Sequence, residues 1–101
     1  MDPLVSIVVI TYNSSQYVLE TLESAKEQTY KNIELIVSDD GSTDDTPNIC
    51  HKWITENSCH FKRVQFVRSE VNTGTPANCN RGIKASLGEW IKVIAGDDLL
   101  D

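Results

Sequence analysis

The chain has 101 residues, which is enough for one domain with a modest hydrophobic core. Its composition, 40% hydrophobic and 24% charged, is that of an ordinary soluble globular protein. The formal net charge of −6 argues against a nucleic-acid-binding protein, whose surface would carry a basic face. It does not exclude a nucleotide ligand, because a metal ion and backbone N–H groups can bind phosphates locally.

Three cysteines, Cys50, Cys59 and Cys79, form no metal-binding CxxC pair, which favours free thiols and a reducing compartment. The N-terminus shows no signal-peptide pattern, and the longest apolar runs fall far short of the roughly 20 residues that span a bilayer. We therefore expect a cytoplasmic protein, with peripheral attachment to the inner face of a membrane as the alternative for a longer form.

Four apolar runs predict strands, and their continuous apolarity is typical of strands covered on both faces, as in a parallel sheet. They are Val5–Ile10, Ile33–Ser38, Val64–Val67 and the run from Trp90 to Gly96. Capping residues and prolines between them predict helices: one over 15–28, one starting at Thr46–Pro47, and one from Thr75–Pro76 to a stop at Gly88.

Each predicted helix carries an apolar face. The expected buried sets are Val18, Leu19, Leu22 and Ala25; Ile49, Cys50, Trp53 and Ile54; and Cys79, Gly82, Ile83, Ser86 and Leu87. The order β-α-β-α-β-α-β predicts an α/β fold, a Rossmann-like open parallel sheet flanked by helices with right-handed crossovers, in one domain over residues 1–101.

Polar clusters follow three of the predicted strands: Thr11–Asn13, Asp39–Ser42 and Asp97–Asp98. In an open parallel sheet all three would lie at the carboxyl edge, where ligands of α/β proteins bind. Each cluster alone also fits a solvated turn. Asp39 and Asp40 also fit helix capping, worth roughly 0.3–1 kcal/mol, and that is the role we expect for Asp44 and Asp45. Together the clusters favour a ligand site.

The chemistry of these clusters suits a nucleotide. Tyr12 offers a flat ring on which a base can stack, and Asp40 could accept from the imide N–H of a uracil. Asp97 and Asp98 would hold a divalent cation, because hard carboxylate oxygens suit Mg²⁺ or Mn²⁺, and that ion would bridge a diphosphate. Neither a Gly-x-Gly-x-x-Gly fingerprint after the first strand nor a P-loop motif is present.

Five segments together resemble the family 2 glycosyltransferases of GT-A fold: Val5–Asn13, Gln28–Tyr30, Glu34–Asp44, Gly88–Ile91 and Gly96–Asp98. The resemblance runs from Val5 to Asp98, and the Asp-Asp-Gly-Ser-Thr-Asp segment with a downstream Asp-Asp is specific in combination. It implies that the chain is the nucleotide-binding half of a GT-A fold.

The resemblance also implies roles for individual residues. Thr11, Tyr12 and Asn13 would pack around the base, and Asp40 would bond the uracil ring. Asp98 would ligate Mn²⁺ or Mg²⁺, with Asp97 near the ribose or the metal. In the loop formed by Asn72, Gly74, Asn80 and Gly82, many relatives carry Arg where this chain has Cys79, and Arg81 lies next to it on a different helical face.

The activity implied is inverting transfer of a sugar from a nucleotide-sugar donor, expected to be UDP-linked, to a hydroxyl acceptor such as a glycan or lipid-linked glycan, as in polysaccharide biosynthesis. Family enzymes continue into an acceptor-binding half that supplies the general base. We therefore expect no catalytic residue in this chain and little transfer by it alone. We also expect self-association through an open sheet edge and exposed apolar surface.

Two other classes of protein remain as alternatives. A nucleotide-binding module without catalysis would have the same residues, because those that discriminate it from an enzyme would lie beyond Asp101. A phospho-acceptor receiver domain needs a lone Asp ending the third strand and a Lys ending the fifth. Here Arg68-Ser69 ends the third strand and no fifth strand is present, which disfavours that class.

Overall fold

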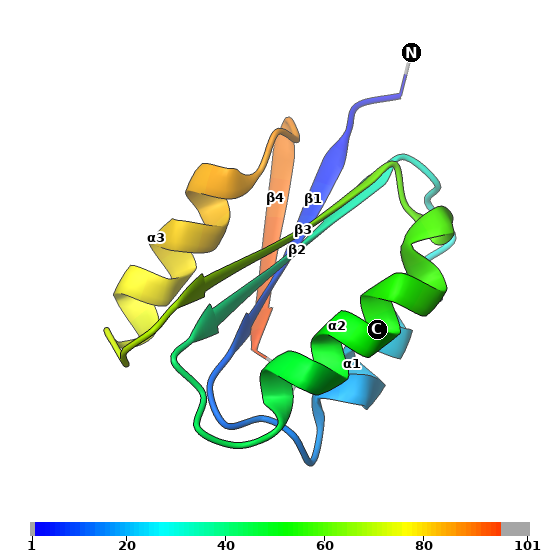
Figure 1. Ribbon diagram of the computed structural model, residues 1–101. Coiled ribbons are helices and arrows are strands. Elements are labelled where there is room, and N and C mark those ends of the chain that lie inside the picture. Colours follow the sequence, from blue (N-terminus) through cyan, green and yellow to red (C-terminus); the bar gives the residue numbers. More distant parts are fainter. Residues whose placement is uncertain (1, 96–101) are drawn as a thin grey trace.

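The structure, a computed structural model, describes residues 2–95 and contains four parallel strands and three α-helices in alternation (Figure 1). The elements are β1 (Val5–Thr11), α1 (Val18–Lys26), β2 (Ile33–Asp40), α2 (Thr46–Asn57), the 3₁₀ helix η1 (Ser58–His60), β3 (Arg63–Ser69), α3 (Thr75–Ala85) and β4 (Trp90–Ala95). The strand order is β3-β2-β1-β4, with every neighbouring pair parallel. The predicted α/β fold with an open parallel sheet is confirmed.

The sheet lies between two helical layers, with α1 and α2 on one face and α3 on the other (Figure 1). Alternate residues of a strand point to opposite faces, so Ile7, Val9, Leu35 and Val37 join the core under α1 and α2. The helices add further buried side chains to this core, which are Val18, Leu22, Ala25, Cys50 and Trp53. Each large apolar side chain buried here contributes roughly 1.5–3 kcal/mol.

α3 packs against the opposite face of the sheet, and Gly82 sets the distance between the helix and the strands. A Cβ on Gly82 would lie 2.4 Å from Val8 Cγ1 and 3.3 Å from Ser38 Cβ, so no larger residue fits without moving the helix. The residues of α3 that are buried are Asn78 and Gly82. The predicted apolar face was therefore wrong in part, because Ile83 and Leu87 are exposed.

The first helix also departs from prediction. α1 begins at Val18, three residues later than predicted, because Ser14 O accepts bonds from Tyr17 N (3.0 Å) and Val18 N (2.8 Å) in a turn that precedes it. Leu19 was predicted to be buried but is 48% exposed. Among the described residues α1 packs against α2 and β1, so only one stripe of the helix is covered.

A buried carboxylate anchors the sheet at its amino edge. Glu34 accepts bonds from Ser6 Oγ (2.6 Å), Arg63 Nη1 (2.7 Å) and the backbone N–H of Leu87. Burial alone would raise the pKa of Glu34, but these donors and the charge of Arg63 outweigh it and lower the pKa. Because the α3–β4 connection is tied to the core in this way, β4 enters the sheet in a fixed position.

β4 is an edge strand among the described residues, since it pairs with β1 alone there. Its side chains are largely exposed, and Trp90, at 66%, is the most exposed of its large apolar residues. Within residues 2–95, no helix has the length and apolarity needed to cross a membrane.

Candidate functional site

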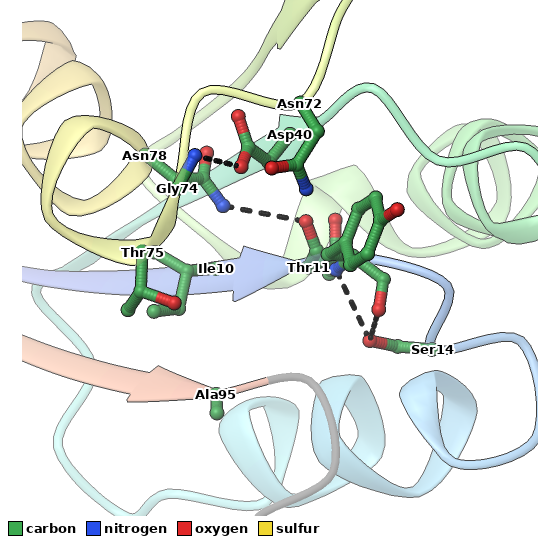
Figure 2. A pocket seen from close by; sticks show the side chains of 10 residues that line it. Ile10, Thr11, Ser14, Asp40, Asn72, Gly74, Thr75, Asn78 and Ala95 are labelled. Carbon is green, nitrogen blue, oxygen red and sulfur yellow. Dashed lines mark hydrogen bonds between the residues drawn. The ribbon is translucent and has the colours of Figure 1, made fainter.

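A pocket of about 310 Å³ opens where β1, β2 and β4 end (Figure 2). It is lined by Ile10, Thr11, Tyr12, Ser14, Asp40, Asn72, Gly74, Thr75, Asn78 and Ala95. These residues come from the ends of β1, β2 and β4, from the loop after β1, from the loop before α3, and from α3 itself. Of the three polar clusters predicted to meet at the carboxyl edge, those after β1 and β2 contribute Thr11, Tyr12 and Asp40 to this pocket, and the third, Asp97–Asp98, lies outside the described residues.

The loop after β1 contributes Thr11 and Tyr12 to the pocket wall. Tyr12 is 48% exposed, so its ring is open to a ligand. The Ser14 hydroxyl holds the backbone of Tyr12: it accepts from Tyr12 N (3.3 Å) and donates to Tyr12 O (3.3 Å). Stacking of a base on this ring stays a prediction.

Asn13, the third residue predicted in this loop, is exposed and is not among the residues that line the pocket. It adopts a left-handed conformation with φ 49°, which Asn tolerates better than most residues. Its Oδ1 accepts bonds from Thr43 N (2.8 Å) and Asp44 N (3.3 Å), and its own N–H donates to Ser42 Oγ (2.9 Å). Asn13 therefore joins the β1–α1 loop to the β2–α2 loop.

The two adjacent aspartates that end β2 have different surroundings, because successive side chains point to opposite faces. Asp39 is fully buried and faces Thr11 in the neighbouring strand. Its oxygens accept from Thr11 Oγ1 (2.7 Å), Ser42 Oγ (2.6 Å), Ser42 N (3.0 Å) and Arg68 Nε (3.3 Å). Donors from within residues 2–95 thus fill all four lone-pair positions of Asp39, which makes it a structural residue.

Asp40 faces the pocket and the loop before α3. Its Oδ1 accepts from Thr73 N (2.9 Å) and Thr73 Oγ1 (2.5 Å), and its Oδ2 accepts from Gly74 N (2.8 Å; Figure 2). Counted over the described donors, these bonds leave one lone-pair position on Oδ2. Burial would raise the pKa of Asp40, but the Thr73 and Gly74 bonds and the nearby Arg81 charge outweigh it, so the pKa is lowered and the group stays ionised.

A third carboxylate, Asp44, orders the start of α2. Its Oδ1 accepts from Thr46 N (3.0 Å) and Thr46 Oγ1 (2.6 Å), and its Oδ2 accepts from Ser15 N (3.2 Å). Asp44 thus accepts from the first N–H of α2, as its predicted capping role requires. The same prediction was wrong for Asp45, because this N-cap residue makes no side-chain cap bond and its carboxylate accepts from Asn48 Nδ2 instead.

Sequence reasoning missed Asn78, which lies 3% exposed in α3 and lines the pocket. Its Oδ1 accepts from Ser38 Oγ (2.7 Å), and its Nδ2 donates to Thr11 O (3.3 Å; Figure 2). The bonds tie α3 to the ends of β1 and β2. Its spacing of four residues from Gly82 placed both on one helical face, and this was the signal that could have found it.

A glycine brings two loops of the site together. Gly41 has φ +76°, and a Cβ there would lie 2.6 Å from Val71 C and 2.9 Å from Asn72 N. A side chain would therefore push the β3–α3 loop, including the pocket residue Asn72, away from the end of β2.

The predicted metal ligands Asp97 and Asp98 lie outside the described residues. Ala95, the last residue of β4, lines the pocket. Residues 2–95 hold no group of three or more His, Cys, Asp or Glu side chains suited to a metal ion. Protein donors already occupy the four lone-pair positions of the Asp39 carboxylate and three of the four on Asp40.

A second cavity, of about 410 Å³, lies between α1 and α2 and is larger than the pocket. Its lining is Leu19, Asp45, Asn48, Ile49, Lys52, Trp53 and Glu56. None of the residues predicted to bind a ligand is among them, and it is not at the carboxyl edge of the sheet, so we do not assign the site to it.

The fold and the pocket together define a class: an α/β protein with a pocket at the carboxyl edge of a parallel sheet, lined by an ionised carboxylate. The family model Glycosyl transferase family 2 matches residues 6–101. The chain therefore belongs to glycosyltransferase family 2, as its resemblance implied.

Curated relatives agree with this assignment. Glycosyltransferase GlyG of Streptococcus pneumoniae is 37% identical over 100 residues, which cover 99% of this chain and 32% of the relative. The UDP-Glc:alpha-D-GlcNAc-diphosphoundecaprenol beta-1,3-glucosyltransferase WfaP of Escherichia coli is 37% identical over 95 residues, covering 94% of this chain and 36% of WfaP. The chain thus spans about a third of the length of these relatives.

Solved structures extend the agreement to three dimensions. Staphylococcus aureus TarS 1–349 in complex with UDP-GlcNAc matches with TM-score 0.80 and 33% identity, over 95% of this chain and 27% of TarS. The mannosyltransferase PcManGT of Pyrobaculum calidifontis, in complex with GDP-Man and Mn²⁺, matches with TM-score 0.89 and 27% identity. The match covers 98% of this chain and 29% of PcManGT. The predicted GT-A type of fold is confirmed.

Proposed function

We propose that the chain binds the nucleotide of a UDP-sugar in the pocket at the carboxyl edge, as the donor-binding part of an inverting, metal-dependent glycosyltransferase. The observation that carries the proposal is Asp40, an ionised acceptor that lines the pocket and keeps one lone-pair position on Oδ2 among the described residues. The binding of UDP-GlcNAc by TarS supports the donor class.

The chemistry of Asp40 favours uracil over cytosine. Uracil presents an imide N–H, which an acceptor-only carboxylate can bind, whereas cytosine presents a lone pair at that ring position, which the carboxylate repels. Tyr12 beside it would stack against the ring plane. Guanine also presents an N–H donor, and PcManGT binds GDP-Man, so GDP is the competing ligand that a test must include.

A divalent cation, Mn²⁺ or Mg²⁺, is proposed as the cofactor, and Asp98 with Asp97 would hold it. Hard cations take carboxylate oxygens, and the Asp39 oxygens are used by protein donors in this structure. When bound, the cation would offset the negative charge on the diphosphate leaving group. The Mn²⁺ in PcManGT supports this choice.

The acceptor is proposed to be a hydroxyl of a glycan or lipid-linked glycan, which WfaP, with a diphosphoundecaprenol-linked sugar in its name, supports. Because the chain spans about a third of such relatives, we propose that it lacks the general base and transfers no sugar by itself. We propose a cytoplasmic setting, with peripheral attachment to the inner face of a membrane as the alternative.

The proposal is tested by calorimetric titration of the chain with UDP, CDP and GDP, each with and without Mn²⁺. We expect Mn²⁺-dependent binding with UDP preferred. Asp40→Asn should weaken UDP binding about tenfold or more, the scale of a lost hydrogen bond to a charged group. Asp45→Asn, which changes an exposed carboxylate bonded to Asn48, is the matched control and should bind as the wild type does.

Three outcomes would reject parts of the proposal. Equal UDP binding by the wild type and by Asp98→Ala in the presence of Mn²⁺ would reject the metal role. Tighter binding of CDP or GDP than of UDP would reject the uracil preference. Multiple-turnover sugar transfer by the 101-residue chain would show that it needs no further residues for catalysis.

A further inference from the structure

Arg81, on α3, contacts three residues around the pocket without lining it. Its Nη1 donates to Asn78 Oδ1 (2.9 Å) and lies 3.6 Å from Asp40 Oδ1, and its Nη2 donates to Thr73 Oγ1 (2.8 Å). The side chain is 24% exposed, so the guanidinium is partly shielded from water. Two of its partners, Asp40 and Asn78, line the pocket.

The guanidinium can only donate, and this fixes which way its partners point. A hydroxyl has one proton and two lone pairs. Because Arg81 occupies a lone pair of Thr73 Oγ1, the hydroxyl proton is directed to Asp40 Oδ1, 2.5 Å away. A carboxylate can only accept, so the order Arg81 to Thr73 to Asp40 has one consistent direction.

The same argument fixes the amide of Asn78. Arg81 Nη1 can only donate, so the atom of that amide which it contacts must be the oxygen. The amide nitrogen is then turned to Thr11 O, at the end of β1. One side chain thus sets the orientation of two polar groups, on the loop before α3 and in the pocket wall.

We propose that Arg81 is a positioning residue of the nucleotide pocket: it orients Thr73 and Asn78 so that the 72–74 loop and the Asp40 carboxylate hold the shape that the ligand meets. This inference rests on the proposed function in taking UDP as the ligand. A guanidinium is needed because its fork reaches two acceptors at fixed angles, whereas the ammonium of a lysine is a single point charge.

The test uses the 101-residue chain with Arg81→Met, which keeps an unbranched apolar stem, and Lys84→Met as the matched control on an exposed turn of α3. The first readout is amide hydrogen exchange at Thr73 and Gly74, whose N–H groups bond Asp40. The second is the Kd for UDP with Mn²⁺. Both are compared with exchange in β2, which reports the stability of the whole fold.

We expect Arg81→Met to speed exchange at Thr73 and Gly74 relative to β2 and to weaken UDP binding about five- to tenfold, the scale of one ordinary hydrogen bond. Lys84→Met should change neither, and Arg81→Lys should restore only part of both. Exchange that rises equally in β2, with an unchanged Kd for the folded chain, would overturn the proposal, since it would reveal a stabilising role alone.

Thr73→Val supplies a second variant in case Arg81→Met folds poorly. If Arg81 acts through the Thr73 hydroxyl, the double variant Arg81→Met/Thr73→Val should lose no more affinity for UDP than about the larger of the two single losses. Additive losses of affinity would overturn the proposed route. A wild-type chain that binds no UDP would reject the proposed function. The exchange data would then still decide whether Arg81 holds the loop, since unchanged exchange at Thr73 and Gly74 overturns that.

Discussion

The pH dependence of stability gives a sharp test of the bonds that join the first two loops, and Asp44 is the residue to change. Burial raises the pKa of Asp44, but bonds from the Thr46 hydroxyl and N–H and from Ser15 outweigh it and lower the pKa from 3.8 to about 2. Asp44→Asn keeps the shape of the side chain and an acceptor oxygen, and it removes the charge.

The magnitude follows from linkage. A pKa lowered by roughly two units corresponds to roughly 2.5 kcal/mol, at about 1.36 kcal/mol per unit. Asp44 is partly exposed, so solvent screening reduces this to about 1–2 kcal/mol. Because the folded pKa is the lower one, the contribution is fully present above about pH 4 and is lost as the pH falls towards about 2.

The assay is urea unfolding of the wild type and Asp44→Asn at a series of pH values. The free energy of unfolding should be lower in the variant by about 1–2 kcal/mol at neutral pH, and the difference should shrink towards zero near pH 2. Asp45→Asn, which removes the neighbouring exposed carboxylate, is the matched control. A difference for Asp44→Asn that stays constant from pH 7 to pH 2 would refute the charge argument.

Two further predictions follow from the packing. Gly41→Ala should lower the free energy of unfolding by more than about 1 kcal/mol in thermal melts, because φ is +76° and the new Cβ would lie 2.6 Å from Val71 C. Gly74→Ala also places a Cβ at a positive φ, +96°, but the nearest atom to it is Pro76 Cδ at 4.0 Å, so this variant should show the cost of backbone strain without that of a clash; a cost as large as that of Gly41→Ala would contradict the clash. Self-association of the chain is predicted from the open β4 edge, and Trp90→Lys should reduce it; a sedimentation coefficient independent of concentration would count against it.

The arrangement of the fold could be predicted because it rests on coarse patterns. Four apolar runs alternating with capped helices leave few topologies, and the carboxyl edge of a parallel sheet then brings Thr11 and Asp40 together. The resemblance to the family added the expectation of a nucleotide-sugar ligand. These inferences needed no side-chain detail.

Finer features could not be predicted, because they depend on which face each residue takes. All eight residues of β2 are buried, so no polar–apolar alternation distinguishes Asp39, a saturated structural carboxylate, from Asp40 at the pocket. The roles of Asn78 and Arg81 required knowing that Gly82 packs against Val8, which sets how α3 lies on the sheet.

The central claim, that a nucleotide binds at the carboxyl edge, is tested most directly by titrating the ¹⁵N-labelled chain with UDP and Mn²⁺ and following backbone NMR signals. The account predicts saturable shifts centred on Thr11, Tyr12, Gly74 and Asn78, which line the pocket. Shifts centred instead on Leu19 and Trp53, in the cavity between α1 and α2, or no saturable shifts at all, would contradict it.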